Sequence, residues 1–96
     1  MQVRWSPEAA EDLELIVEYI SRENPSAGRR VAQTIYERAG ALQTLPYRGR
    51  PGRIEGTREL PLPSLPFVVI YRVLERANAV EIVNVIHGAQ RWPPAD

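Results

Sequence analysis

The order of two hydrophobic periods constrains this chain more than any other feature. From residue 7 to residue 45, apolar side chains recur every three or four positions, as on one face of an α-helix. From residue 57 to residue 86, they form short stretches rich in β-branched and aromatic residues, as in buried strands. Helices grouped first and strands grouped last predict an α+β fold, in which the helices cover one face of a sheet.

Two helices are expected in the first half, because a helix start signal occurs twice. Ser6-Pro7 and Asn24-Pro25 each place a capping side chain before a proline at the first helical position. The first helix is predicted to run through about Ser21 and the second up to Leu45, where Pro46 stops it. Helices joined by so short a link form an antiparallel hairpin.

One strand is expected before the helices and three after them. They cover Gln2 to Trp5 and residues 57–62, 67–74 and 79–86. The connections between the last three are too short for parallel crossovers, so these strands form an antiparallel meander. Pro61 has no N–H for a ladder and is expected to face outward or to lie at an edge. The predicted order is β-α-α-β-β-β, with an N-terminal strand and a helical hairpin packed on an antiparallel β-sheet.

Composition narrows the class of protein. Hydrophobic residues make up 44% and charged residues 25% of the 96 positions, which is typical of a globular chain. This length predicts a single domain over residues 1–96. With no cysteine and one histidine, the chain lacks a disulfide framework and a Cys/His zinc site, and we expect no metal and no cofactor. The absence of a long apolar run and of a signal peptide predicts a cytoplasmic protein.

The net charge of zero hides an uneven distribution. The first 24 residues hold six acids and two arginines, whereas residues 25–58 hold seven arginines and two acids. All twelve basic residues are arginine, whose planar guanidinium suits forked contacts with carboxylate or phosphate. A GC-rich genome would give the same composition. The chain is therefore polarised, with an acidic first segment and a basic middle.

A glycine- and arginine-rich segment between the two halves is the strongest candidate for contact with an anion. It runs from Pro46 to Gly56, and neither a Walker motif nor a following helix accompanies it. Its basic side chains either face solvent or contact a nucleic acid or an acidic partner. Trp92, near the end of the chain, either packs over the sheet or stacks on a base, and we prefer packing. The candidate binding residues are Arg48, Arg50, Arg53, Arg58, Arg72 and Trp92.

Cleavage of a phosphodiester without a metal would need a general base, a general acid and cations around the phosphorus. Arg72 interrupts an apolar strand, so we expect it to be partly buried and to have a carboxylate or phosphate partner. A lone histidine at a strand end, such as His87, is either structural or a displayed catalytic group. The candidate catalytic residues, which apply only to a ribonuclease, are His87, Arg58, Arg72, Glu59 and Arg91.

Three segments of the second half have a characteristic order and spacing. They are Gly56-Thr57-Arg58-Glu59-Leu60, Pro66-Phe67-Val68-Val69-Ile70-Tyr71-Arg72-Val73 and Val80-Glu81-Ile82-Val83-Asn84-Val85-Ile86-His87-Gly88-Ala89. Together with the Ser-Pro-Glu-Ala-Ala-Glu-Asp-Leu helix start and a Leu-x-x-x-Pro-x-x-Gly-Arg-Pro segment, they resemble the RelE/ParE superfamily of bacterial toxins over nearly the whole chain. The resemblance implies the growth-inhibiting toxin of a type II toxin–antitoxin (plasmid stabilisation) module.

The resemblance leaves two targets open. RelE-like members are ribosome-dependent mRNA endonucleases that use lysines and arginines on the sheet. In an alignment on the strand from Phe67 to Val73, Glu59 and Pro61 replace two of those lysines and Val68 replaces a catalytic arginine. His87 is similar to the C-terminal histidine of other nuclease members, so the ribonuclease alternative stays open. ParE-like members poison DNA gyrase and have no recognised acid/base set, and we favour that branch.

The resemblance also implies a partner. The antitoxin is expected to come from the same operon, to be acidic and partly disordered, and to fold on the toxin as a hetero-oligomer. We predict that it contacts some of Arg48, Arg53, Arg58 and Arg72. The expected target is DNA gyrase or the translating ribosome with its mRNA, and no membrane is involved. Whether the chain is an enzyme depends on the target, and a degenerate toxin that only binds antitoxin is a third alternative.

Overall fold

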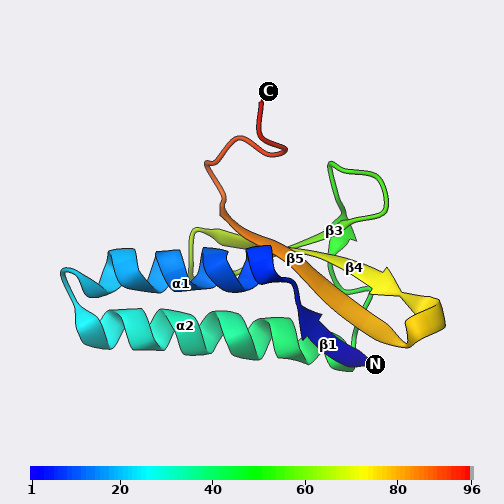
Figure 1. The fold of residues 1–96 in the computed structure, drawn as a ribbon, viewed down its shortest axis with the longest axis horizontal. Coiled ribbons are helices and arrows are strands. Elements are labelled where there is room, and N and C mark those ends of the chain that lie inside the picture. The colour runs from blue at the N-terminus through cyan, green and yellow to red at the C-terminus, as the bar shows by residue number, and fades with distance from the viewer. Residues whose placement is uncertain (96) are drawn as a thin grey trace.

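The computed structural model describes residues 1–95, which form a helical hairpin beside a five-stranded sheet (Figure 1). The helices are α1 (Pro7–Ser21) and α2 (Pro25–Gly40), with short 3-10 turns η1 (Ala41–Gln43) and η2 (Glu75–Ala77). The strands are β1 (Gln2–Trp5), β2 (Arg50–Pro51), β3 (Arg58–Pro61), β4 (Phe67–Leu74) and β5 (Ala79–His87). The predicted α+β order is confirmed, with the two-residue β2 added.

The sheet is mixed. Its strand order is β1-β5-β4-β3-β2, and β3, β4 and β5 form the expected antiparallel meander. The expectation of an antiparallel sheet does not extend to β1, which pairs in parallel with β5 from Gln2 opposite Ala79 to Trp5 opposite Ile82. The physical reason is that both helices and three strands separate β1 from β5, so no short turn fixes their direction.

Both helices begin where the capping residues predict. The Ser6 side chain accepts a hydrogen bond from the Ala9 amide, and the Asn24 side chain accepts one from Ala27. The second helix ends at Gly40 rather than at Leu45, and the chain continues as the 3-10 turn η1. Glycine has a low helix propensity, which accounts for the earlier end.

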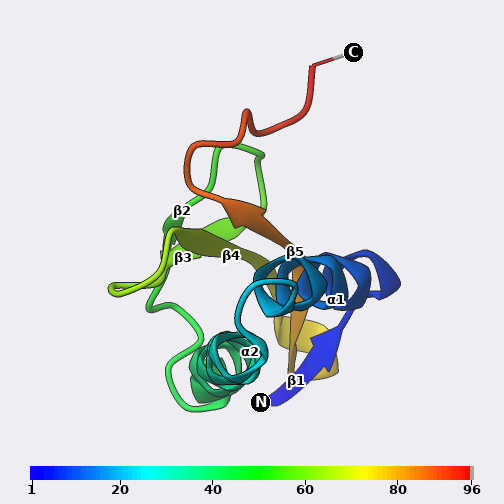
Figure 2. The same ribbon diagram turned by 90° about the vertical axis from the view of Figure 1, so that its left-hand side faces the viewer.

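The helices cover one face of the sheet, which we call the helix face (Figure 2). Val69 and Tyr71 of β4 point to this face and are fully buried. Val68 and Ile70 alternate with them and point to the other side, which we call the opposite face. The core of the helix face is formed by Ala9, Ile35, Ala39, Leu42, Leu60, Leu62, Val69, Tyr71, Val80, Ile82 and Val85. The prediction that β4 is covered on both sides is therefore confirmed.

The start of α1 closes the edge of β5 beyond the point where β1 ends. The Ser6 hydroxyl donates to the Val83 carbonyl at 2.9 Å. The Asp12 carboxylate accepts from the Val85 amide at 2.9 Å and from the Asn84 side chain at 2.8 Å. At the other side of the sheet, Pro61 is exposed in β3, as its missing N–H predicts. Within residues 1–95, no helix has the length and apolarity needed to cross a membrane.

Candidate functional site

A buried carboxylate organises the opposite face of the sheet. Glu59 of β3 is 1% exposed, and its two oxygens accept from Arg50 and Arg53 at distances of 3.0 to 3.1 Å. Arg53 contributes its backbone N–H and two guanidinium nitrogens, while Arg50 contributes one nitrogen. These contacts fold the arginine-rich segment back onto the strand that follows it. We call Glu59, Arg50 and Arg53 the carboxylate clamp.

The clamp determines the protonation state of Glu59. Burial raises the pKa of this carboxyl, but hydrogen bonds from the side chain and backbone of Arg53 and from Arg50 outweigh burial and lower the pKa to about 2. An acid of this strength stays ionised near neutral pH and holds no proton to donate. Its oxygens are also occupied by arginine donors. Glu59 therefore has a structural role, which argues against its predicted role as an acid or base.

Trp92 packs against the same face. Its side chain contacts the apolar cluster of Val68, Ile70 and Ile86, as expected for packing over the sheet. Its carbonyl accepts from Arg53 at 3.4 Å, which links the tail to the clamp. Its indole N–H is buried and has no hydrogen-bond partner among the described residues. The ring is partly buried against this cluster, which favours packing over stacking on a base.

His87 lies on the helix face, because it pairs with Phe67 at the end of β5. The two rings meet edge to face, with their centroids 5.7 Å apart. His87 Nδ1 accepts from the Ala89 amide at 3.0 Å, so one ring nitrogen is used in the local turn. Across the sheet, Glu59 points to the opposite face. His87 and Glu59 consequently cannot act as an acid and base on one phosphate.

Arg58 also belongs to the helix face, where it holds the loop before β2. Its guanidinium donates to the Gly49 carbonyl at 2.6 Å and lies 5.0 Å from the centre of the Tyr47 ring. The Tyr47 hydroxyl in turn donates to Glu75, which raises the pKa of Tyr47. Arg58 is thus engaged within the chain, and its side chain is only partly exposed.

Arg72 differs from its expectation. It was predicted to be partly buried with an anionic partner, but its side chain is exposed on the opposite face. It lies across from Glu81 in the strand register, and no ion pair to it occurs within residues 1–95. The reason is local: Trp92 covers Val68 and Ile70 but not this end of β4. Arg48 and Arg91 are exposed as well, in the loop before β2 and in the tail.

The predicted catalytic residues therefore do not form one site. Glu59 and Arg72 lie on the opposite face, His87 and Arg58 lie on the helix face, and Arg91 is in the C-terminal tail. Among the residues that the structure describes, no group of three or more His, Asp or Glu side chains could hold a metal ion. The arrangement supports binding surfaces with exposed arginines, rather than acid/base chemistry at one point.

Sequence reasoning missed two positioning residues. The buried Tyr71 hydroxyl donates to the Pro46 carbonyl at 2.7 Å and accepts from the Gly49 amide at 2.8 Å, so it fixes the loop. Burial raises the pKa of Tyr71. Asp12, one of the acids of the first helix, binds the edge of β5. A tyrosine in an apolar strand was the available signal for the first, while nothing local distinguished Asp12 from its acidic neighbours.

Comparison of the sequence with known proteins identifies its family. A family model described as the ParE toxin of the type II toxin–antitoxin system parDE matches residues 3–92. The curated protein Y4kP of Sinorhizobium fredii, whose name assigns it provisionally as a toxin, is 40% identical over 92 residues, which are 96% of this chain and 93% of that protein.

Solved structures agree with this placement. The chromosomal ParDE system of P. aeruginosa has a TM-score of 0.81 at 29% identity, with 91% of this chain and 95% of that chain covered. The toxin–antitoxin complex RelBE2 of Mycobacterium tuberculosis has a TM-score of 0.66 at 27% identity and covers 90% and 95%. Isolated E. coli RelE, with a TM-score of 0.59 at 12% identity over 96% and 87%, shares the fold alone.

Fold and surface together define a toxin of the RelE/ParE superfamily. Within that class, the chain belongs to the ParE toxin family of type II toxin–antitoxin systems. The resemblance stated from the sequence is thereby confirmed at the level of the family.

Proposed function

We propose that this chain arrests growth by binding and poisoning DNA gyrase, and that a cognate antitoxin from the same operon neutralises it. The observation that carries the proposal is the separation of the acid/base candidates. His87 and Glu59 lie on opposite faces, and both Glu59 oxygens accept from arginines. This separation favours a toxin that acts by binding over one that acts by acid/base catalysis. Such a module would act in the cytoplasm and would stabilise a plasmid that carried it.

The ribonuclease alternative has little support from the geometry. General acid/base catalysis requires both groups within hydrogen-bond reach of one substrate. The positions that correspond to basic residues in RelE-like members hold the clamped Glu59, the exposed Pro61 and the buried Val68. None of these side chains can stabilise a phosphorane. His87 is the remaining candidate, and its Nδ1 accepts from Ala89.

Exposed arginines are the proposed contacts for the acidic antitoxin or for the target. Arg48 and Arg72 are exposed and have no ion pair within residues 1–95. Arg50 and Arg53 already neutralise Glu59, so they offer less free charge to a partner. We therefore assign Arg48 and Arg72 the larger share of electrostatic contact, with a salt-dependent effect on association.

Two assays on purified chain test the proposal. We expect gyrase supercoiling to be inhibited and mRNA in a translating extract to stay intact. In cells, His87→Ala should arrest growth as strongly as the wild type, because His87 has no catalytic part to lose. Codon-specific mRNA cleavage that His87→Ala abolishes would establish the ribonuclease instead. Absence of growth arrest on expression would establish a degenerate toxin.

A further inference from the structure

Large apolar side chains are exposed at three places on this molecule. They are Tyr36 on α2, Leu15 and Tyr19 on α1, and Leu45 and Tyr47 in the chain that follows η1. Clustered apolar groups with a polar rim mark contact surfaces, whereas scattered ones need no explanation. The surroundings of the three places differ, and the difference favours one of them as a binding surface.

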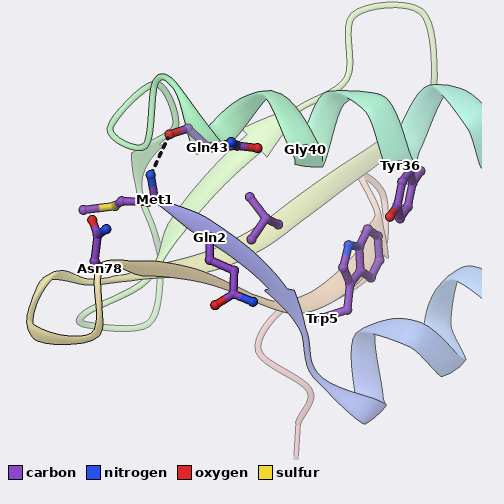
Figure 3. Close-up of a pocket in the computed structure, with 8 residues that line it drawn as sticks. Met1, Gln2, Trp5, Tyr36, Gly40, Gln43 and Asn78 are labelled. Atoms are coloured by element: carbon purple, nitrogen blue, oxygen red, sulfur yellow. Dashed lines mark hydrogen bonds between the residues drawn. The ribbon is translucent and has the colours of Figure 1, made fainter.

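Tyr36 lies in a pocket of about 600 Å³ between β1 and α2 (Figure 3). Its ring stacks on that of Trp5, with the two centroids 6.1 Å apart, so one of its faces already has an aromatic partner. Gln2, Gln43 and Asn78 line the same pocket. The surroundings of Tyr36 are thus partly polar, and they carry no charged side chain that would select a partner.

Leu15 and Tyr19 line an apolar groove of about 410 Å³ beside α1, which Leu65 and Phe67 complete. The lining residues that the structure describes include no arginine. The groove offers apolar contact but lacks a cation that would orient an acidic partner.

The third place combines apolar and cationic groups. It is the segment Thr44–Arg48, which we call the display loop, and its five residues surround one hollow of about 360 Å³. Leu45 and Tyr47 are about half exposed, and Arg48 is exposed with no ion pair within residues 1–95. Residues 41–50 hold two arginines and no acid. Tyrosine and arginine are enriched among the residues that contribute most to protein interfaces.

Buried bonds hold the display loop in one conformation. The Tyr71 hydroxyl donates to the Pro46 carbonyl at 2.7 Å and accepts from the Gly49 amide at 2.8 Å. Arg58 donates to the Gly49 carbonyl at 2.6 Å and lies over the Tyr47 ring. A Cβ at Gly49 would lie 2.7 Å from the Tyr71 ring, so the loop backbone fits closely against the core. A surface that is ordered in advance loses less entropy on binding.

Order and charge together select the occupant. A disordered chain that folds on binding suits a groove, whereas a fixed loop suits a folded partner whose surface is also formed in advance. Arg48 requires a carboxylate or a phosphate on that partner. Leu45 and the hollow gain nothing from a phosphate backbone, because they need an apolar side chain to cover them. The best fit is a folded protein with an acidic, partly apolar surface.

We infer that the display loop is the surface through which this chain binds gyrase. Arg48 pairs with a carboxylate of that enzyme, and an apolar side chain of gyrase enters the hollow beside Leu45 and Tyr47. The inference rests on the proposed function and names the surface that performs it. Arg72, which lies on the opposite face, takes no part in this contact.

The first test measures binding of the full chain to purified gyrase in the absence of DNA. Arg48→Glu should weaken binding at least about tenfold, equivalent to about 1.4 kcal/mol. Arg22→Glu makes the same change of charge at the far end of the hairpin and should bind within about threefold of wild type. Leu45→Ser should weaken binding about fivefold, whereas Leu15→Ser, at 55% exposure against 58% for Leu45, should not.

A crosslinking measurement locates the contact without removing a binding residue. The chain has no cysteine, so one introduced cysteine carries a photo-crosslinker at a known position. Thr44→Cys, in the display loop, should crosslink to gyrase. Glu23→Cys, in the turn between α1 and α2, should not. Both positions are exposed, and both labelled chains should still inhibit gyrase.

The outcomes separate this inference from the proposed function. If wild type inhibits gyrase and both Arg48→Glu and Leu45→Ser inhibit it equally, the inference alone is overturned. An equal loss of binding to DNA without gyrase would assign the display loop to DNA. Lost antitoxin binding with unchanged gyrase binding would assign it to the antitoxin, and either result overturns the inference. If wild type neither binds nor inhibits gyrase, the proposed function and the inference fail together.

Discussion

The two faces of the sheet are held by different interactions. On the helix face, α1 and α2 bury apolar side chains such as Ile35, Val69 and Ile82, all 0% exposed. On the opposite face, one tryptophan covers a small apolar cluster, and the carboxylate clamp holds the loop beside it. Apolar burial is insensitive to pH, whereas a buried carboxylate is not. The helix face therefore carries the larger apolar core, and the opposite face adds the ionic contacts that hold Arg50 and Arg53 beside β3.

Removal of the clamp carboxylate is expected to have the largest effect. Glu59→Ala removes the acceptor of the hydrogen bonds from Arg50 and Arg53 and should destabilise the chain by about 3 kcal/mol, the upper range for hydrogen bonds to a charged group, because the half-exposed arginines that remain are solvated. Urea denaturation measures the change in the free energy of unfolding. Arg72→Ala, an exposed residue of the same face, serves as the control and should change it by less than about 0.5 kcal/mol. A cost for Glu59→Ala no larger than that of the control would contradict the clamp.

Acid should loosen the opposite face selectively. The folded pKa of Glu59, about 2, lies below its ordinary value of 4.5, so its contribution is complete above pH 4.5 and is lost as pH falls toward 2. The difference corresponds to about 3 kcal/mol. Glu59→Gln should lack this part of the acid dependence, whereas Ile35→Ala on the helix face should keep it. Parallel acid titration curves for wild type and Glu59→Gln would show that other carboxyls are responsible.

A smaller effect is expected where the helix face holds the loop. Tyr71→Phe removes one hydroxyl that bonds to both Pro46 and Gly49 while the ring stays in the core. We expect a loss of about 1–3 kcal/mol, because a buried N–H and a carbonyl lose their partner. Thermal unfolding provides the measurement, with the exposed Tyr19→Phe as the control. An unchanged melting temperature would mean that solvent replaces these bonds without cost.

The smallest effect on stability is expected at His87, the last residue of β5. Its ring contacts Phe67 only at an edge, and its side chain is exposed. His87→Ala should change the free energy of unfolding by less than about 1 kcal/mol. A larger loss would assign His87 a structural role on the helix face that its exposure does not indicate.

Local signals predicted most of the elements of this fold. Ser6 and Asn24 cap the helices as expected, because capping depends on residues within one turn. The apolar run of β4 predicted a strand buried on both faces, which burial of Val68 through Tyr71 confirms. The parallel pairing of β1 with β5 could not be predicted, because it depends on contacts nearly eighty positions apart.

The candidate site was less predictable for the same reason. The sequence predicted Glu59 as a candidate acid/base residue. In the structure, the arginine-rich loop folds back onto β3 and its Arg53 binds the Glu59 carboxylate. Arg72 was expected to be buried, since its strand is apolar, but the exposed end of the opposite face depends on the path of the tail around Trp92. Strand alternation places Tyr71 and Arg72 on different faces, but alternation alone does not tell which face remains open.

The central claim, that this ParE-family chain poisons gyrase by binding and cleaves no RNA, is tested most directly by gyrase-mediated DNA cleavage. Purified chain is added to gyrase and supercoiled DNA, and trapped cleavage complexes are counted with and without the antitoxin. We predict that the complexes accumulate with wild type and with His87→Ala and disappear when antitoxin is added. Unchanged gyrase cleavage by a chain that still arrests growth would contradict the account.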